Sequence, residues 1–204
     1  KIMLLGLYAG IKNVKEDKDN KNKHLMTSVL ITAKRHKGKK DIEDSALLAT
    51  EFITMNEICA KDSESHTFIP KVLGMDLAGI EKGNLPEDFV EHFRESFKRC
   101  LMMTIHAGED ESVESVWQAV YSLHASRVGH GLKLDDYLDL KRLFKDRQLC
   151  VELCPKSNQY TNGYIFDEKD SNNKQNRYVF QNYKEYGIPV TINTDNPLLS
   201  HRTN

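Results

Sequence analysis

The sequence predicts an α/β fold of the (β/α)8 TIM-barrel type that is incomplete, with about six of the eight strands present. Short, almost continuous apolar segments alternate with amphipathic segments, as in a parallel sheet covered by helices. Polar residues follow several of the apolar segments, and the strand ends of a parallel barrel converge on one face. A chain of 204 residues with 39% hydrophobic side chains can bury one substantial core.

Short segments with the apolar composition of buried strands recur along the chain. They are residues 28–33, 68–77, 101–105, 127–130, 149–154 and 189–193. A complete barrel needs two more strands and usually has about 250 residues. We therefore expect residues 1–204 to be a single barrel domain that is truncated at both ends.

Segments with helical spacing of apolar residues separate most of these strands. They are residues 41–59, 87–99, 112–123, 137–146 and 178–186. In the first of them Asp41 is a predicted N-cap, and the inward face includes Leu47, Leu48 and Phe52. The inward face of the third is predicted to contain Val113, Val116, Trp117 and Val120. Residues 157–176, rich in Asn, Asp and Lys, are predicted to form a long loop on the face where the strands end.

The charge balance argues against nucleic acid or a membrane as partner. The 29 basic and 30 acidic residues nearly cancel, so no global field would hold the chain on a polyanion. The basic cluster at residues 34–40 is interpreted as a solvated surface. No apolar run reaches the roughly 20 residues that span a bilayer. We expect a small-molecule partner and a cytoplasmic protein.

The cysteines do not predict a disulfide framework. Four cysteines at irregular spacing suggest reduced thiols. Cys150 and Cys154 have a spacing that a structural zinc pair could use, but the chain has no second cysteine pair to complete such a site. Core packing is the preferred interpretation for both.

Polar side chains stand at four predicted strand ends. They are Asp76 and Gly79, His106 and Glu109, His130 between two glycines, and Asp195 with Asn196. Taken singly, a strand-end histidine is usually structural, and an aspartate before Asn-Pro is usually a turn or cap residue. Together, two imidazoles and two carboxylates at one end of a barrel are suited to binding zinc and moving protons.

In this order the motifs resemble those of the adenosine deaminase family of the amidohydrolase superfamily. The motifs are Met75-Asp-Leu-Ala-Gly, Thr104-Ile-His-Ala-Gly-Glu, Arg127-Val-Gly-His-Gly, Glu152-Leu-Cys-Pro-Lys-Ser-Asn and Asn193-Thr-Asp-Asn-Pro. The resemblance covers residues from about 28 to 204. It implies a metal-dependent hydrolase barrel with one zinc ion at the mouth where the strands end.

The resemblance also implies a role for each residue. His106 and Asp195 would be zinc ligands, and Glu109 would be the proton donor to purine N1. His130 would orient or deprotonate the attacking water, and the Gly79 backbone would bind the purine N3 region. The reaction would be hydrolytic deamination of adenosine, and of deoxyadenosine, to inosine and ammonia in purine salvage. Glu109 can act as an acid only if burial near other acids raises its pKa.

Two features depart from the family pattern. Asn196 stands where many members have a second aspartate, although its amide can still donate a hydrogen bond to purine N7. None of the eight histidines forms the His-x-His pair that supplies two zinc ligands in the family. A catalytic zinc normally has at least three protein ligands. We therefore expect this segment alone to bind zinc poorly and to be inactive.

Two further interpretations stay open at this stage. The same barrel motifs would serve a deaminase of adenine or AMP. A catalytically inactive, purine-binding homologue would explain the missing His-x-His pair, although it gives no reason for Glu109, His130 and Asp195 to occur together.

Overall fold

One parallel sheet organises the protein. The computed structural model describes residues 10, 13, 28–61, 71–162 and 178–196. Within these residues the sheet has six strands in the order β1-β2-β3-β4-β5-β6, and every neighbouring pair is parallel. The strands are β1 (Ser28–Lys34), β2 (Lys71–Ala78), β3 (Met102–Ala107), β4 (Arg127–His130), β5 (Cys150–Leu153) and β6 (Val190–Ile192).

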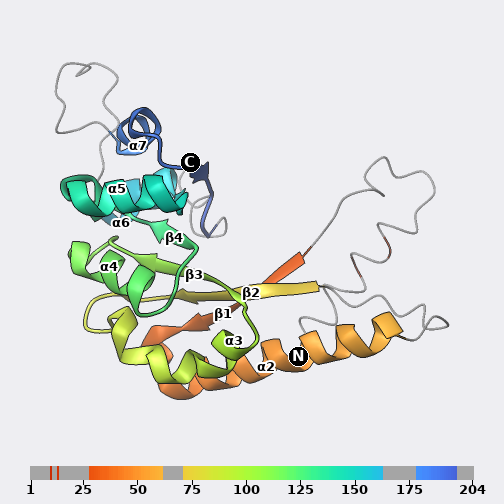
Figure 1. Ribbon diagram of the computed structural model, residues 1–204. Coiled ribbons are helices and arrows are strands. Elements are labelled where there is room, and N and C mark those ends of the chain that lie inside the picture. The colour runs from red at the N-terminus through yellow and green to blue at the C-terminus, as the bar shows by residue number, and fades with distance from the viewer. Residues whose placement is uncertain (1–9, 11–12, 14–27, 62–70, 163–177, 197–204) are drawn as a thin grey trace.

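The sheet is an open arc among the described residues. β1 and β6 form its two edges and do not pair with each other (Figure 1). The architecture confirms the prediction of an incomplete α/β barrel. All six predicted strands are present. The strand at 127–130 has the predicted ends and the other five have shifted ends, and the first three residues of the segment 68–77 lie outside the described residues.

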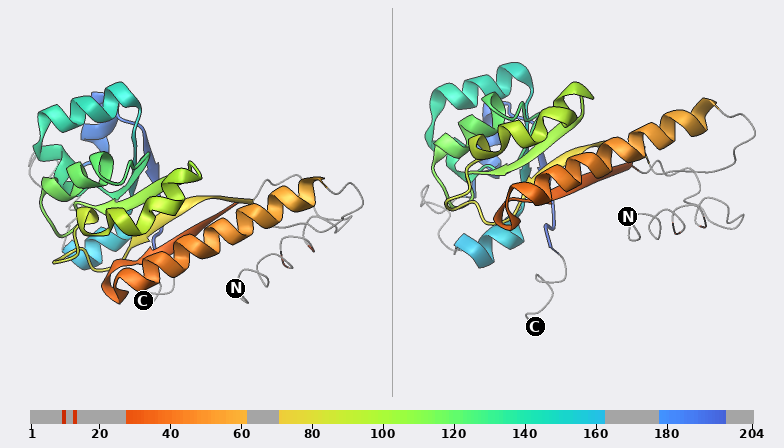
Figure 2. Two further views of the ribbon diagram at one scale, coloured as in Figure 1. Left: turned by 60° about the horizontal axis from the view of Figure 1, so that its bottom comes forward. Right: turned by 90° about the horizontal axis from the view of Figure 1, so that it is seen from below.

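Helices cover the outer face of the arc (Figures 1 and 2). The α-helices are α2 (Lys39–Lys61), α3 (Arg94–Lys98), α4 (Val113–Tyr121), α5 (Leu138–Arg147), α6 (Pro155–Asn162) and α7 (Phe180–Tyr186). Short 3-10 helices are η1 (Arg35–Lys37), η2 (Pro86–Phe93) and η3 (Leu132–Asp136). Helix α2 packs along β1 and β2, α4 contacts β3 and β4, and α7 contacts β6.

Three predictions about local structure are wrong. The segment 87–99 forms η2 followed by the short α3, in place of one α-helix. Helix α2 begins at Lys39, so Asp41 is not its N-cap. The Asp41 carboxylate instead accepts a hydrogen bond from the backbone N–H of Lys34 at 2.8 Å, and this bond joins the helix to the end of β1. The predicted loop at 157–176 is helical in α6 up to Asn162, and the rest of it lies outside the described residues.

The core lies between the sheet and the helices. Its largest fully buried apolar side chains include Phe52, Phe93, Ile105, Phe144 and Tyr183. Two residues predicted to face inward are exposed: Leu47 is 69% exposed and Trp117 is 44% exposed. In α4 the buried positions are Ser115, Val116, Gln118, Ala119 and Val120. This stripe leaves Trp117 on the flank of the helix, where it stacks on Tyr121 with 4.7 Å between ring centroids.

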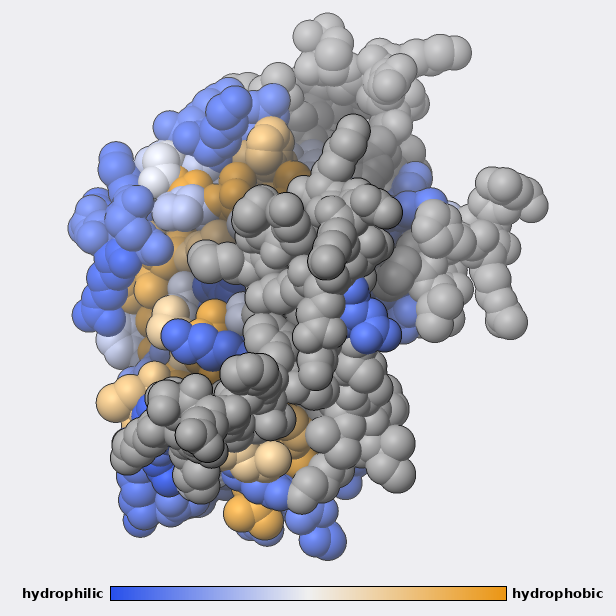
Figure 3. All heavy atoms as spheres, turned by 90° about the vertical axis from the view of Figure 1, so that its right-hand side faces the viewer, coloured by the Kyte–Doolittle hydropathy of each residue, from blue (hydrophilic) through white to orange (hydrophobic). Residues whose placement is uncertain are grey.

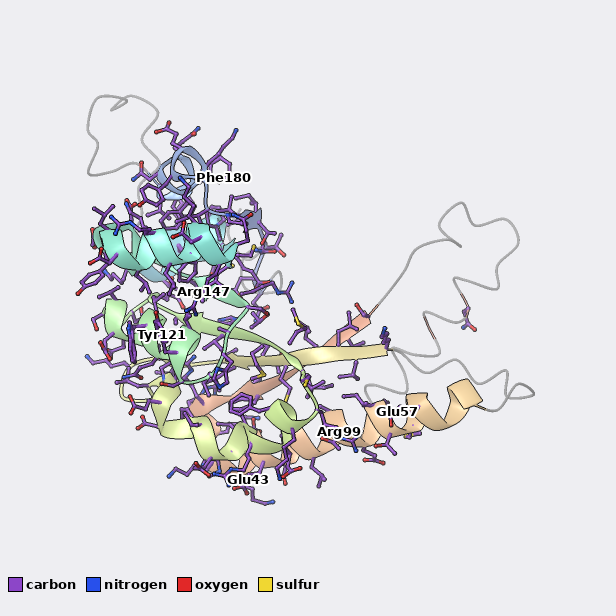
Figure 4. All side chains as sticks on the ribbon, in the orientation of Figure 1. Glu43, Glu57, Arg99, Tyr121, Arg147 and Phe180 are labelled. Carbon is purple, nitrogen blue, oxygen red and sulfur yellow. The ribbon has the colours of Figure 1, made fainter. Side chains whose placement is uncertain are left out.

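Polar contacts join the helices at the surface (Figure 4). Arg147 at the end of α5 lies over Tyr121 of α4, with its Cζ 5.6 Å from the ring centroid. On the opposite side of the molecule, Arg99 lies 3.9 Å from Glu57 of α2. These contacts are solvent-exposed, and exposed ion pairs contribute at most about 1 kcal/mol each. The buried core therefore dominates the packing of the helices.

Apolar side chains also reach the surface. Leu73 of β2, Met102 of β3 and Ile192 of β6 are 40%, 54% and 58% exposed. Figure 3 shows apolar surface between hydrophilic regions on one face of the molecule. In the part of the chain that the structure describes, no helix combines the length and apolar character needed to cross a membrane.

Candidate active site

The ends of the strands bring all six predicted site residues to one cavity. The cavity has a volume of about 510 Å³, and its lining includes Gly79, His106, Glu109, His130, Asp195 and Asn196. A second cavity of about 710 Å³ shares His106, Asp195 and Asn196 with it and adds Asp76 and Thr32. The parallel register explains the proximity of the two histidines, because β3 and β4 pair His106 with Gly129 and Ala107 with His130.

His106 lies at the end of β3 beside a required glycine. A Cβ atom at Gly129 would stand 2.9 Å from His106 Cδ2, so a side chain there would displace the ring. Burial lowers the pKa of His106 to about 4, and the nearby His130 adds to the effect. The imidazole is therefore neutral at physiological pH, which is the state that binds metals.

Asp76, at the end of β2, places a carboxylate against His106. Its Oδ1 lies 3.5 Å from His106 Nε2, while Thr32 Oγ1 donates to its Oδ2 at 3.2 Å. Within the described residues, the buried Oδ1 has no hydrogen-bond partner. Burial raises the pKa of Asp76 to about 7, and Glu152 contributes further. A buried oxygen without a donor, next to a metal-binding nitrogen, is a position that suits a cation.

Asp195 follows β6 in a left-handed backbone conformation with φ of 59°. Ser157 Oγ donates to its Oδ2 at 2.6 Å. Ligand atoms of Asp195, His130 and Cys154 all lie within 4.8 Å of one another. Among the described residues, a group of three possible metal ligands therefore pairs Asp195 with His130 and Cys154, whereas the predicted partner of Asp195 was His106.

Cys154 combines burial with a place at the site. It is 6% exposed, as the core interpretation predicted, and it also lines the larger cavity. Burial raises the pKa of its thiol to about 12, helped by the charge of Asp195. The thiol is therefore protonated in the metal-free protein.

Glu109 faces His130 across the smaller cavity. Its Oε2 lies 3.4 Å from His130 Nε2, and its Oε1 accepts from Thr161 Oγ1 at 2.9 Å. Burial raises the pKa of Glu109, and the charges of Asp110 and Asp195 add to that rise, although His130 and Thr161 oppose it. A carboxyl group with a raised pKa can hold a proton near neutrality.

His130 is almost completely buried, and its ring is fixed by Asn158. The Asn158 Nδ2 atom lies 2.9 Å from His130 Nδ1 and 3.5 Å from Glu109 Oε1. Tyr178 Oη donates to Asn158 Oδ1 at 3.0 Å. An amide NH2 group directed at Nδ1 suits the tautomer whose proton is on Nε2, the ring nitrogen that faces Glu109.

Gly79 follows β2 with a φ of 98°, which few other residues adopt. A Cβ atom there would lie 2.3 Å from His36 Nδ1. The same His36 nitrogen accepts the backbone N–H of Ile80 at 3.4 Å. Glycine thus allows the turn to lie against His36 at the cavity wall.

Sequence reasoning missed several residues that contact the site. Ser157, Asn158 and Thr161 were placed in a loop, but helix α6 directs all three toward Asp195, His130 and Glu109. Pro155 at the first position of α6 was the available signal, since proline is favoured there. Asp76 was noted at a strand end, but no metal role was assigned to it.

Comparisons with known proteins agree with these features. The family model for adenosine deaminase matches residues 25–203. The adenosine deaminase of Pseudoalteromonas translucida is 34% identical over 142 residues, which are 69% of this chain and 40% of that protein. The chain thus spans well under half the length of that relative.

Solved structures share the fold. An adenine deaminase from Arthrobacter aurescens has a TM-score of 0.62 at 21% identity, over 83% of this chain and 45% of that one. A zinc-bound amidohydrolase from Burkholderia ambifaria has a TM-score of 0.65 at 20% identity, over 85% of this chain and 42% of that one.

Proposed function

Because the chain belongs to the adenosine deaminase family, we propose that its protein hydrolyses adenosine and deoxyadenosine to the corresponding inosines and ammonia. The observation that carries this proposal is the shared cavity, whose lining includes Gly79, His106, Glu109, His130, Asp195 and Asn196. A volume of about 510 Å³ is within the usual range for a small-molecule site. Residues 1–204 are proposed to belong to one catalytic barrel domain.

We propose that the site holds one zinc ion, which the chemistry of the donor side chains supports. His106 offers a neutral imidazole, Asp195 a carboxylate, and Asp76 a buried oxygen without a donor among the described residues. Nitrogen and carboxylate oxygen are the ligands of catalytic zinc sites, and Cys154 adds a sulfur nearby. Zinc, when bound, lowers the pKa of water toward neutrality. Ser157 orients Asp195 for this role through the hydrogen bond to Oδ2.

Glu109 is the proposed proton donor. Attack of water at C6 of the purine breaks the aromaticity of the ring, so N1 must gain a proton in the same step. The raised pKa of Glu109 leaves a proton on the carboxyl group near neutrality. Thr161 and Asn158 hold its Oε1, which leaves Oε2 toward His130 and the cavity.

His130 is proposed to orient the attacking water. The Asn158 amide at Nδ1 suits the tautomer with the proton on Nε2, and in that tautomer Nε2 donates a hydrogen bond. This favours the orienting role over proton abstraction. Asn196 would donate to purine N7 through its amide, and the Gly79 backbone would contact the purine N3 side.

Turnover assays of the full-length protein with zinc would distinguish the candidate substrates, which are adenosine, deoxyadenosine, adenine and AMP. Loss of ultraviolet absorbance and release of ammonia report turnover. We expect turnover of the nucleosides at least tenfold faster than that of adenine and AMP, about 1.4 kcal/mol in kcat/KM. Preferred turnover of adenine or AMP would replace the proposed substrate. Purine binding without any ammonia release would identify an inactive homologue.

A cytoplasmic location is part of the same proposal. The thiols of Cys100, Cys150 and Cys154 are free, as a reducing compartment requires. Fractionation of the source cells with antibodies against the protein would test the location.

A further inference from the structure

A buried carboxylate outside the six predicted site residues holds the loop that carries Glu109. Glu81 follows β2 and is 3% exposed. Its oxygens accept the backbone N–H groups of Gly108 at 2.6 Å, Glu109 at 3.0 Å, Asp110 at 2.9 Å and Glu111 at 3.2 Å. The hydroxyl of Ser115, in α4, donates to the same carboxylate. One side chain therefore binds four consecutive backbone donors and the helix that follows them.

These donors make Glu81 a fixed negative charge. Burial alone would raise the pKa of its carboxyl group, but the hydrogen bonds from Ser115 and from the loop outweigh burial and bring it below its ordinary value. Consecutive N–H groups directed at one point form an anion-binding concavity. Here the anion is supplied by the chain itself.

Residues 108–111 lie in the loop between β3 and α4, so the hydrogen-bonding pattern of a strand or helix does not supply acceptors for their N–H groups. It begins after Ala107, the last residue of β3, and ends at Ser112, the N-cap of α4. His106 precedes the loop, and its carbonyl oxygen accepts from the buried Arg35 guanidinium. Arg35 and Glu81 thus hold the two ends of the short segment from His106 to Glu111.

We propose that Glu81 is a positioning residue for Glu109, setting the place of its backbone and hence the direction of its carboxyl group. The proposal rests on the deaminase function above, in which Glu109 is the proton donor. Glu81 is not among the residues that line either cavity, and it contacts Glu109 through the backbone of the loop.

A double-mutant cycle in the zinc-loaded full-length protein tests this role. Glu81→Gln keeps the size of the side chain but directs an amide NH2 at backbone donors. We expect kcat for adenosine to fall about 10- to 100-fold, the loss of one or two charged hydrogen bonds, while KM changes less than about threefold. In a Glu109→Gln background the same change should lower the residual kcat less than about threefold. Equal losses in both backgrounds would show a general structural effect and overturn the proposal.

Two further variants complete the design. Glu87→Gln, an exposed carboxylate of η2, is the matched control and should leave kcat unchanged. If Glu81→Gln does not fold, Glu81→Asp takes its place in the cycle, because it keeps the charge but shortens its reach to the loop. The same non-additivity is then required of Glu81→Asp.

Hydrogen exchange tests the hold on the loop without using activity. Amides 108–111 should exchange at least about tenfold faster in Glu81→Gln, whereas amides of β4 should not change. Unchanged exchange at 108–111 overturns the proposal even if activity falls. If the wild-type protein deaminates no purine, the proposed function fails, and faster exchange still shows that Glu81 holds the loop.

Discussion

Replacing Arg35 by methionine is expected to cause a large loss of stability, because this side chain joins three segments inside the protein. Arg35 is completely buried. It donates to the carbonyl oxygens of Asn84 at 3.0 Å and Leu77 at 3.3 Å, and to that of His106. Methionine fills a similar volume but leaves these carbonyls without their donor.

The magnitude follows from opposing contributions. Three hydrogen bonds from a charged donor contribute about 1.5 to 3 kcal/mol each, roughly 4.5 to 9 kcal/mol together. Burial opposes the charged form of Arg35 and lowers its pKa, and removing the cation recovers part of that cost. The charge of Glu81, which favours the cation, then loses this attraction but keeps its hydrogen bonds from the loop and from Ser115. The net destabilisation should be about 3 to 5 kcal/mol, the range for breaking a buried ionic interaction.

Urea denaturation of the full-length protein, followed by circular dichroism, would measure this loss. The expected loss is about 3 to 5 kcal/mol in the free energy of unfolding. Arg94→Met is the control, because Arg94 pairs with Glu91 at 2.7 Å on the exposed surface and its loss should change the free energy of unfolding by less than about 1 kcal/mol. Equal decreases in the two variants would refute the reasoning that Arg35 acts through buried carbonyls.

Other predictions address the site directly. Glu109→Gln should retain zinc and lower kcat by at least about 100-fold, whereas Asp195→Ala should lose both zinc and turnover. Zinc content and turnover are measured on the same samples, and near-normal turnover of Glu109→Gln would contradict the role of Glu109 as proton donor. Ser157→Ala should weaken zinc binding about 10- to 100-fold in a chelator competition, because the Asp195 carboxylate loses its orienting donor, and unchanged affinity would argue against that function. Burial raises the pKa of Asp76 to about 7, so in metal-free protein its contribution to stability is present at low pH and is lost as the pH rises through 7. Asp76→Asn should remove this loss of stability between pH 5 and pH 8, measured as urea midpoints at the two pH values. The same pH dependence in Asp76→Asn and the wild type would contradict the prediction.

Most of the strands were predictable because they are short, largely apolar segments that alternate with amphipathic ones. The segment Arg127–His130 is short and contains two polar residues, and its place between two amphipathic segments favoured a strand. The positions of His106, His130 and Asp195 followed, since each comes at the end of such a strand. Their presence at one cavity depends on the parallel order of the sheet, which alternation of strands and helices predicts.

Contacts between distant segments were not predictable. Glu81 lies 27 residues before Gly108, and nothing in the local sequence identifies the N–H groups that it binds. Asn158 was hidden because a polar sequence rich in Asn and Lys was interpreted as a loop, although it contains α6. Trp117 was placed inward with Val113, Val116 and Val120, whereas the buried positions of α4 include Val116 and Val120 and leave Trp117 44% exposed.

Two residues of the site have a backbone conformation that favours glycine. His130 has a φ of 63° and Asp195 a φ of 59°, and such positions typically cost a non-glycine residue about 1 to 3 kcal/mol. His130 is buried and bonded to Asn158, so a smaller residue there would lose these contacts, whereas Asp195 is exposed. Directed evolution for heat resistance alone would therefore favour glycine or asparagine at Asp195. The variants it selects would melt later and lack the carboxylate, so thermal selection of this protein should always be paired with selection for turnover.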